Sequence, residues 1–379
     1  MLVGDRSKFF GVIIGLAFAA LLMTQQSAIF FGVMALTYGH ATDTPQAEIW
    51  ISDPGMMDFS ISDVLNEREL DNVRAIQGVS WAAPLLRRLV FSRDSQNAIS
   101  PIMVLGIDDA TCIGGPLPEA MVTGSAGDIL RPNAVILDDY GSSRKLRTSD
   151  IDGKSRPVMI GDQVALNGHN FEVVGFCRST LAIIPYPTAY MLRSRLSMLD
   201  RGVDGAFNFI IAGVDSQADP NEVCARIAAA TGLAARTRKD FCQKIYDYYL
   251  YKTGLPANFA IAVILGFIVG AAIAGQTFSQ FVNDNRRIFA SLKAMGMRNS
   301  GLMRILFIQA SFSAMLGLGL GVGGATIFGL LLKGTDLSFR LEPILLFISF
   351  AAVLLISLSA AMISLRSLLR LDPAIVFRS

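Results

Sequence analysis

The hydrophobic positions of this chain form four long runs, and one polar-rich region separates the first run from the other three. The runs are Phe9 to Leu36, 256 to 280, 302 to 332 and 343 to 365. At about 1.5 Å of rise per helical residue, each run is long enough to cross the roughly 30 Å hydrocarbon core of a bilayer. The pattern predicts an α+β membrane protein with four transmembrane helices, one plus three. A large mixed α/β extracytoplasmic domain, residues 37 to 254, is inserted between the first and second helices.

The first run has a competing interpretation as a cleaved signal peptide. Arg6 and Lys8 precede it, as basic residues precede such peptides. The hydrophobic region of a signal peptide usually has about 7 to 15 residues, which is far shorter than this run. We therefore expect a retained transmembrane helix, and either interpretation places the following region outside the cytoplasm.

Two groups of strand and helix patterns lie toward the two ends of the domain from 37 to 254. The first has strand patterns at 48–52 and 79–91 around a helical pattern at 67–76, and the second has a strand at 207–214 and a helix at 221–231. Asp219 and Pro220 precede that last helix and Gly232 follows it, which are preferred start and stop residues. The two groups are predicted to flank an insert within this domain.

An insert from about 93 to about 198 separates these groups. Ile160 to Cys177 contains two short alternating runs joined by Asn167 and Gly168. An Asn-Gly pair between alternating runs is a strong indication of a β-hairpin. After the second group, a tyrosine-rich segment at 236–254 predicts a stalk helix near the lipid boundary. This helix either continues rigidly into the next membrane run or ends as an interfacial helix.

Small residues recur at four-residue spacing in three of the membrane runs. This spacing puts them on one helix face, where the absence of a side chain lets another helix approach closely. The run from 302 to 332 is especially rich in glycine, and close helix packing, including packing across a dimer, explains this better than a phosphate-binding loop. The predicted helix-packing residues are Gly11, Gly15, Gly266, Gly270, Gly317 and Gly321.

Composition and charge agree with a membrane protein. The chain has 379 residues, of which 52% are hydrophobic, and its mean hydropathy is +0.47. The region from 37 to 254 holds 21 Lys and Arg against 26 Asp and Glu, although the whole chain has a net charge of +2. An acidic block between basic-flanked apolar runs is typical of a domain held outside the cytoplasm, and nucleic acid is not expected as a partner.

The basic loop from 281 to 301 is predicted to be cytoplasmic and to contain a short amphipathic helix. Its arginines and lysine face only one acidic residue, Asp284, and Ile288 continues its apolar stripe. We expect this segment to be a docking helix. The predicted docking residues are Arg286, Arg287, Phe289, Leu292, Lys293, Met295 and Gly296, the last as the helix stop. An alternative role for the arginines is to fix topology and contact lipid headgroups.

The same charge rule completes the topology. Residues 1–8 and 366–379 are predicted to be cytoplasmic and 333–342 to lie on the other side, so both termini are expected on the cytoplasmic side of the membrane.

The chain carries few residues suited to catalysis or metal binding. Its only histidines are His40 and His169, and its four cysteines form no Cys-x-x-Cys pair. The cysteines lie in the region predicted to be exported. Disulfide bonds and buried free thiols are both compatible with their spacing. No Walker A motif occurs, so nucleotide phosphates cannot be held in the P-loop manner. We expect no catalytic residue, metal or cofactor in this chain.

Four segments resemble the MacB/FtsX-type permeases of ABC exporters, and specifically their DevC-like branch. The segments are FASLKAMG at 289–296, IGDQVALNGHNFEVVGF at 160–176, DPNEVCARIAAATGLAARTRKDF at 219–241 and LDPAIVFR at 371–378. The resemblance implies a homodimeric permease subunit that works by mechanotransmission. It further implies a separate cytoplasmic ABC ATPase, a periplasmic membrane-fusion adaptor and an outer-membrane duct as partners, and efflux of a lipid-like or hydrophobic substrate.

The chain departs from the branch at two places. Ile288 stands where the branch usually has an acidic residue before the aromatic of the coupling helix, so we expect Arg286 or Arg287 to meet an acidic groove edge instead. The chain also begins close to its first membrane run, whereas many relatives have an amphipathic amino-terminal helix.

Two other functional classes stay open. One is an FtsX-like transmembrane regulator that activates an extracytoplasmic cell-wall hydrolase. The other is a membrane-anchored enzyme, which the shortage of histidines and of paired catalytic residues disfavours.

Overall fold

The computed structural model describes residues 6–93, 98–149, 155–180, 182–199, 205–332, 335 and 337–369. The chain divides into two compact units, one of residues 1–33 and 253–379 and the other of Met34–Lys252. Residues 1–5 of the predicted amino terminus and 370–379 of the predicted tail lie outside the described residues. So do 333, 334 and 336 of the predicted periplasmic loop.

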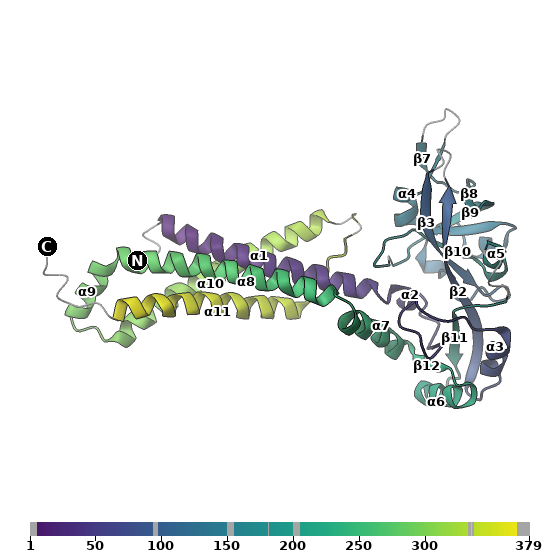
Figure 1. Cartoon of the computed structure of the whole chain (residues 1–379). Coiled ribbons are helices and arrows are strands. Elements are labelled where there is room, and N and C mark those ends of the chain that lie inside the picture. The colour runs from purple at the N-terminus through teal and green to yellow at the C-terminus, as the bar shows by residue number, and fades with distance from the viewer. Residues whose placement is uncertain are drawn as a thin grey trace. The chain divides into compact units, whose positions relative to one another are not determined.

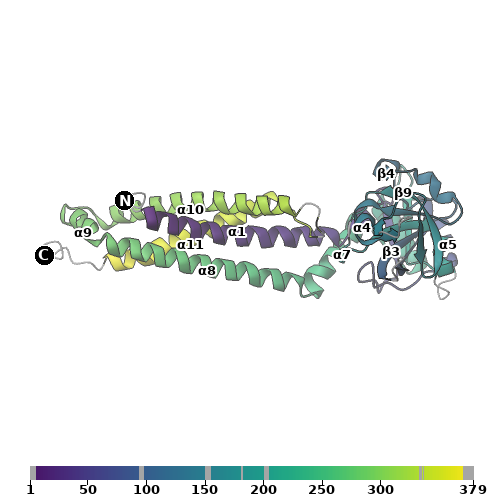
Figure 2. The same cartoon turned by 90° about the horizontal axis from the view of Figure 1, so that it is seen from above.

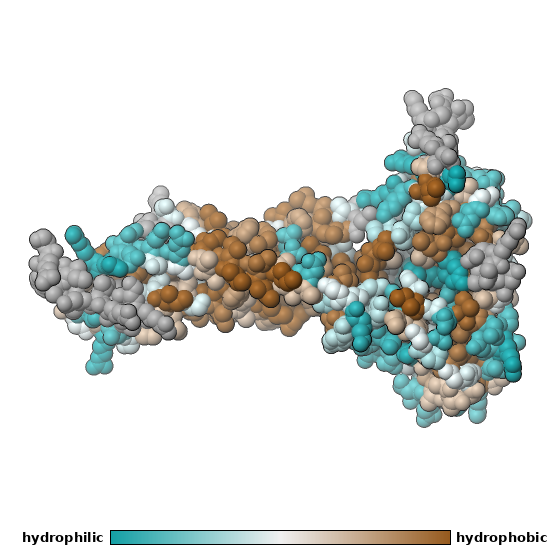
Figure 3. Space-filling view, viewed as in Figure 1, coloured by the Kyte–Doolittle hydropathy of each residue, from teal (hydrophilic) through white to brown (hydrophobic). Residues whose placement is uncertain are grey.

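The first unit is a bundle of long helices that run side by side (Figures 1 and 2). Among the described residues, four helices are long and apolar enough to cross a membrane. They are α1 (Arg6–Leu36), α8 (Leu255–Asp284), α10 (Asn299–Leu331) and α11 (Pro343–Leu369), and the short α9 (Arg286–Ala294) lies between α8 and α10 in the chain. Hydrophobic side chains cover the middle of this bundle (Figure 3). The chain is thus a multi-pass membrane protein with the expected arrangement of one plus three spans.

Glycines bring the helices of the bundle into close contact. A Cβ atom on Gly270 of α8 would lie 2.3 Å from the Cβ of Ala19 on α1, and one on Gly15 would lie 2.4 Å from Ile273. On α10, a Cβ at Gly317 would lie 2.6 Å from the Cβ of Leu16, and one at Gly321 would lie 2.5 Å from the carbonyl oxygen of Ala17. These glycines let α1 lie against α8 and α10 at distances that other residues would prevent.

The remaining predicted packing glycines lie in looser contacts. A Cβ at Gly11 would be 3.5 Å from Thr277, and one at Gly266 would be 3.2 Å from the Cβ of Leu22. By contrast, Gly319 and Gly323 of α10 have nothing within 4 Å of an added Cβ. The glycine-dense segment of α10 therefore has one face packed within the chain and another face that is open.

Buried hydroxyl groups join helices inside the bundle. Thr24 on α1 and Ser349 on α11 share a hydrogen bond of 2.9 Å between their hydroxyl oxygens. The Ser357 hydroxyl on α11 donates to the carbonyl oxygen of Ala310 on α10 at 2.8 Å. Such bonds hold helices together because polar groups in hydrocarbon have no water to bond with.

In the second unit, the two predicted strand and helix groups come together in one antiparallel half-sheet. Its strands run in the order β12, β1, β11, β2. Their bounds are Ala234–Thr237, Ile49–Ser52, Phe209–Val214 and Val79–Arg93, and the helices beside them are α3 (Glu67–Arg74) and α6 (Pro220–Thr231) (Figure 1). Local caps fix both helices, since the Asn66 and Asp219 side chains accept N-terminal N–H groups and Gly232 ends α6 in the left-handed region.

The insert builds the other half of the sheet on the same long strand. Residues 79–85 of β2 pair with β11, whereas residues 86–93 pair with β3, and Pro84 stands next to this change of partner. The strand order continues β3, β10, β5, β9, β4, with β8 pairing β2 and β9. Their bounds are Ile99–Ile107, Thr188–Leu192, Ala134–Asp138, His169–Cys177, Met121–Thr123 and Gln163–Leu166. The smaller elements are β6 (Arg147–Ser149), β7 (Ser155–Pro157), α2 (Gly39–Thr42), α4 (Asp139–Lys145), α5 (Arg193–Leu199), η2 (Pro118–Ala120) and η3 (Ala126–Leu130).

The predicted hairpin is confirmed as β8 and β9. Asn167 and Gly168 form its turn with positive φ angles of 46° and 84°. Both values suit a two-residue turn of this kind, for which Asn-Gly is the preferred sequence. The Asn167 side chain also accepts the N–H of Phe91, which ties the turn to β2.

Both faces of the sheet are buried, and successive strand residues alternate between two cores. Ile49 and Ile51 face the core that includes α3 and α6, whereas Trp50 faces the other core together with Phe241. Phe241 belongs to α7 (Arg238–Lys252), and its ring stacks on Trp50 with centroids 4.9 Å apart. Because the central strands β1, β5, β10 and β11 are covered on both sides, their residues read as continuous apolar runs, whereas β8 and the end of β2 alternate.

Two sequence expectations need correction or completion. The stalk helix was predicted from 236, but α7 begins at Arg238 because Ala234–Thr237 pair with β1 as strand β12. Thr253 and Gly254 are also not helical, so α7 and α8 are separate helices. All four cysteines are free thiols, which resolves the choice between disulfides and free thiols in this structure.

Candidate functional site

Helix α9 is the first candidate site, and its ends are set by local interactions. The Asn285 side-chain amide donates to the carbonyl oxygen of Phe281 at the end of α8, which satisfies one of the helix-end carbonyls. The helix ends at Ala294, and Gly296 takes a φ of 91° that favours glycine. The N–H of Met297 then bonds back to the carbonyl oxygen of Leu292 at 3.1 Å. The result is a short, well-terminated helix between two long apolar helices.

One face of α9 is packed inside the chain. Phe289 and Ala290 are only 1% and 2% exposed. The Phe289 ring lies edge-on to that of Phe281, with centroids 6.3 Å apart, and Leu292 packs partly buried on the same cluster. In this structure the Phe289 side chain therefore anchors α9 to α8, and its predicted part in ATPase docking stays a prediction.

Other side chains of α9 and of the turn that follows it are exposed. Ile288 is 46% exposed and Met295 is 75% exposed, and both arginines, Arg286 and Arg287, are exposed as well. Lys293 is half-buried and Gly296 is exposed. In Figure 3 hydrophilic side chains gather around this end of the bundle. The seven predicted docking residues thus share one short segment but divide between an anchoring face and a free face.

The second candidate site is a cavity of about 210 Å³ inside the domain unit. It is lined by polar residues from separate segments, His40, Asp58, Arg87 and Tyr249, and by apolar side chains. Asp58 lies at its polar end, where its carboxyl group accepts a hydrogen bond of 2.6 Å from the Tyr249 hydroxyl and further hydrogen bonds from the N–H groups of Ser60 and Ile61. The Arg87 guanidinium donates to the carbonyl oxygen of Phe59 and to the Ser60 hydroxyl, both at 3.2 Å.

Burial shifts the titration of this polar cluster. Desolvation, helped by the positive charge of Arg87, lowers the pKa of His40 to about 3, so its imidazole is neutral at physiological pH. Desolvation also lowers the pKa of Arg87 to about 10, although the nearby Asp58 opposes that change. Burial and the hydrogen bond to Asp58 raise the pKa of Tyr249, so its hydroxyl stays protonated. The cluster therefore contains one cation, Arg87, beside a fully bonded carboxyl group.

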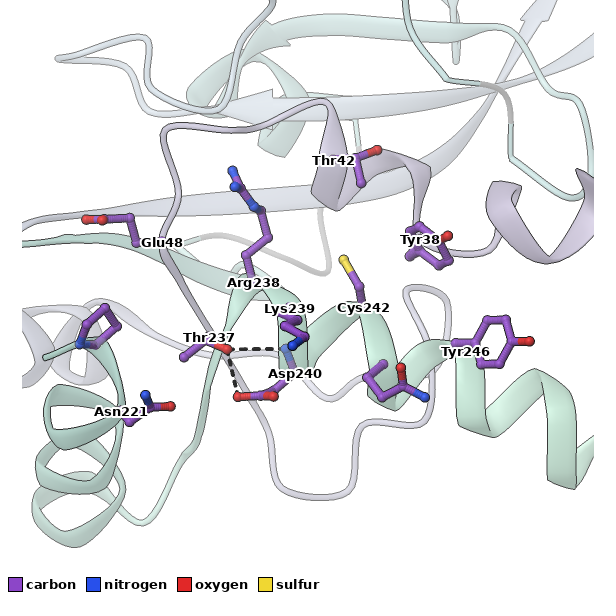
Figure 4. A pocket seen from close by; sticks show the side chains of 12 residues that line it. Tyr38, Thr42, Glu48, Asn221, Thr237, Arg238, Lys239, Asp240, Cys242 and Tyr246 are labelled. Atoms are coloured by element: carbon purple, nitrogen blue, oxygen red, sulfur yellow. Dashed lines mark hydrogen bonds between the residues drawn. The ribbon is translucent and has the colours of Figure 1, made fainter. Parts of the chain in front are cut away.

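A larger and more open groove of about 790 Å³ lies where α2, α6 and α7 meet (Figure 4). Thr237 and Asp240 cap the start of α7 by bonding to each other, and the Arg238 side chain donates to the carbonyl oxygen of Pro45 at 2.6 Å. Tyr246 and Cys242 complete the wall along α7 (Figure 4). These polar groups satisfy one another or the backbone, so the groove does not indicate a ligand class.

Metal chemistry finds no support in the part of the chain that the structure describes, where no cluster of three or more His, Cys, Asp or Glu is placed to hold an ion. Sequence reasoning missed the polar cavity, because its four residues are distant in the chain. One available indication was His40, one of only two histidines, since it lies next to the end of the first apolar run.

Comparisons with known proteins cover both units. The family model of the MacB-like periplasmic core domain matches residues 9–230, and that of the FtsX-like permease C-terminal region matches residues 260–373. No curated protein matches the chain.

Two solved structures are similar over about half of the chain. The extracellular domain of the noncanonical ABC-type transporter YknZ from Gram-positive bacteria has 14% identity and a TM-score of 0.34, covering 50% of this chain and 98% of its own. The periplasmic region of MacB from Actinobacillus actinomycetemcomitans has 11% identity and a TM-score of 0.38, covering 53% of this chain and 93% of its own.

Proposed function

The chain belongs to the MacB/FtsX-type ABC permease family, and from that premise we propose that it is the permease subunit of an exporter that works by mechanotransmission. The family is the non-catalytic permease component of ABC systems and works with an ABC ATPase. In the proposal, a separate ATPase pushes on α9, and the motion reaches the domain between α1 and α8. A periplasmic adaptor and an outer-membrane duct then receive a lipid-like or hydrophobic substrate.

The observation that carries this proposal is the divided surface of α9. Phe289 ties the helix into the bundle, while Ile288, Met295 and the two arginines face outward. A helix that is anchored on one face and free on the other can pass a push from a partner to the helices behind it. The exposed cations suit an acidic edge on the ATPase, with the two exposed apolar side chains as the central contacts.

A homodimer is part of the proposal, and the open face of α10 at Gly319 and Gly323 is suited to it. A second copy could approach closely there, because small residues allow helix backbones to come together. Placement in the DevC-like branch stays a prediction, and its tail motif at 371–378 lies outside the described residues. Both termini are proposed to be cytoplasmic in a bacterial inner membrane.

The docking surface is tested by affinity purification of the full chain in mild detergent, followed by identification of its partners. We expect Met295→Glu and Ile288→Glu each to reduce recovery of the ABC ATPase roughly tenfold, because each adds a negative charge at the centre of the contact. Met198→Glu is the matched control, since Met198 is also an exposed methionine, at 67%, but lies on α5 of the domain.

Full recovery of the ATPase with both α9 variants would contradict docking through this face. Phe289→Ala separates anchoring from docking, because it leaves the exposed residues in place and is expected to destabilise the bundle by about 3 kcal/mol. The same purification addresses the alternative role. A membrane-fusion adaptor among the partners supports export, whereas a cell-wall hydrolase supports an FtsX-like regulator.

A further inference from the structure

The polar cavity of the domain is built around buried groups that the proposed ATPase coupling does not use. His40 is 6% exposed and Asp58 is 5% exposed, so both lie well below the protein surface. Leu36, Met103 and the segment Ala182–Ile184 form apolar parts of the wall. The cavity therefore combines a charged, buried end with an apolar lining.

The buried end has hydrogen-bond donors without acceptors. Asp58 already receives three donors, from Ser60, Ile61 and Tyr249. By contrast, neither the Arg87 Nε–H nor either ring nitrogen of His40 has a partner among the described residues. An unsatisfied buried donor is costly, so most such groups in native proteins meet protein, water or a ligand. Because a neutral imidazole has one N–H and one acceptor nitrogen, the described residues leave this end without an acceptor for the His40 N–H and for the Arg87 Nε–H.

The apolar lining indicates what else the ligand carries. Ile184 is 58% exposed, so this wall extends from the cavity to the surface of the domain. Leu36 is the last residue of α1 and of the candidate span Phe9–Leu36, so the cavity wall begins where the chain leaves an apolar helix. A molecule with an oxyanion at one end and a hydrocarbon chain at the other would satisfy both parts of the lining.

We propose that this cavity binds the anionic headgroup of a single-chain amphiphile. Its carboxylate or phosphate oxygens accept from the Arg87 Nε–H and from the neutral His40 ring, in a charge-assisted contact with the guanidinium. Its chain lies along Met103 and Ala182–Ile184. This site goes beyond the proposed export function, because binding requires neither the ATPase nor an adaptor and is measured without them.

The test uses the full chain in nanodiscs of phosphatidylcholine with a photoreactive diazirine analogue of palmitate. After illumination, mass spectrometry is expected to find the label on peptides that contain Leu36 or Ala182–Ile184. Unlabelled palmitate and lysophosphatidate should both compete, which covers the carboxylate and the phosphate forms of the headgroup. Acetate and inorganic phosphate at the same concentrations should not compete. If they did compete, the cavity would be a site for free oxyanions, and the proposal of an amphiphile as its ligand would be wrong.

Variants connect the label to the cavity. Arg87→Gln is expected to reduce labelling about tenfold, since it removes a charge-assisted hydrogen bond. The neighbouring Arg88→Gln should label like wild type, because Arg88 bonds to Asn208 and does not line the cavity.

A second variant covers the case in which Arg87→Gln fails to fold. Ile184→Asp places a charge on the exposed apolar wall, leaves the buried cluster intact, and is also expected to lower labelling about tenfold. Labelling of Ile184→Asp at the wild-type level, or label found only on the membrane helices, would overturn the proposal.

Discussion

At the scale of single residues, Asp138 shows how a buried carboxylate couples the domain to pH. It is the last residue of β5 and the N-cap of α4, where it accepts the N–H of Gly141, and it also accepts the N–H of Thr188 on β10 at 2.6 Å. Its side chain is 1% exposed. Burial raises the pKa of Asp138 to about 6, even though these hydrogen bonds act in the opposite direction.

This raised pKa predicts how stability changes with pH. Between the ordinary aspartate pKa of 3.8 and about 6, the folded domain binds a proton that the unfolded chain has released. The contribution of Asp138 to stability is therefore fully present below this window and is lost as pH rises through it, by on the order of 3 kcal/mol for a shift of this size. We expect Asp138→Asn to flatten that slope, since an amide does not titrate. Urea unfolding at several pH values between 4 and 7 measures how the free energy of unfolding depends on pH.

The readout for this experiment comes from the chain itself. Trp50 and Trp81 are its two tryptophans, and both lie in strands of the domain, so their fluorescence follows this unit in the full chain. Asp139→Asn is the control, because Asp139 is the exposed neighbour. An equal loss of slope in both variants would show that Asp138 is not the responsible group.

At the scale of elements, the bundle depends on where its glycines fall along each helix. On α8, Gly270 meets Ala19 of α1 and Ile356 of α11, whereas Gly275, five residues later, has nothing within 4 Å. Five residues correspond to roughly 140° beyond one full helical turn, so the two glycines occupy different faces. Only the face that carries Gly270 is used for close packing.

We expect Gly270→Leu to destabilise the bundle by about 1 to 3 kcal/mol, because the added side chain collides with Ala19 and overpacks the contact. Gly275→Leu adds the same atoms to the same helix and should leave stability within about 0.5 kcal/mol of wild type. Thermal unfolding of the full chain in detergent, followed by circular dichroism, compares the two. Equal stability of the two variants would show that α8 does not pack on α1 through Gly270.

At the scale of the whole molecule, the proposed function requires the domain and α9 to be on opposite sides of the membrane. An ATPase that uses cytoplasmic ATP must reach α9, and an adaptor or an exported substrate must reach the domain. The distribution of basic residues favours this arrangement, since they concentrate in the loop that contains α9.

Cysteine labelling in whole cells tests this topology. In a variant whose four native cysteines are replaced by alanine, Ser216→Cys marks the domain and Ser300→Cys marks the start of α10, and both serines are exposed. A membrane-impermeant maleimide that passes the outer membrane should label Ser216→Cys in intact cells and Ser300→Cys only after the inner membrane is opened. The reverse order would place the domain in the cytoplasm and would exclude the proposed export.

The sequence by itself determined the features that depend on neighbours in the chain. The four apolar spans, the caps of α6, the Asn167–Gly168 turn and the left-handed stop at Gly296 follow from residue spacing and from the backbone preferences of single residues. These features were predictable because their energetics are local.

Only the tertiary structure decided which faces of these elements are covered. Periodicity predicted that Phe289 and Met295 belong to one apolar stripe of the loop helix. In the structure, α8 buries Phe289 against Phe281, whereas Met295 is exposed. It likewise brings His40, Arg87 and Tyr249 to one cavity from three distant segments. A periodic pattern reports that a face is apolar, whereas the partner of that face is set by packing between segments far apart in the sequence.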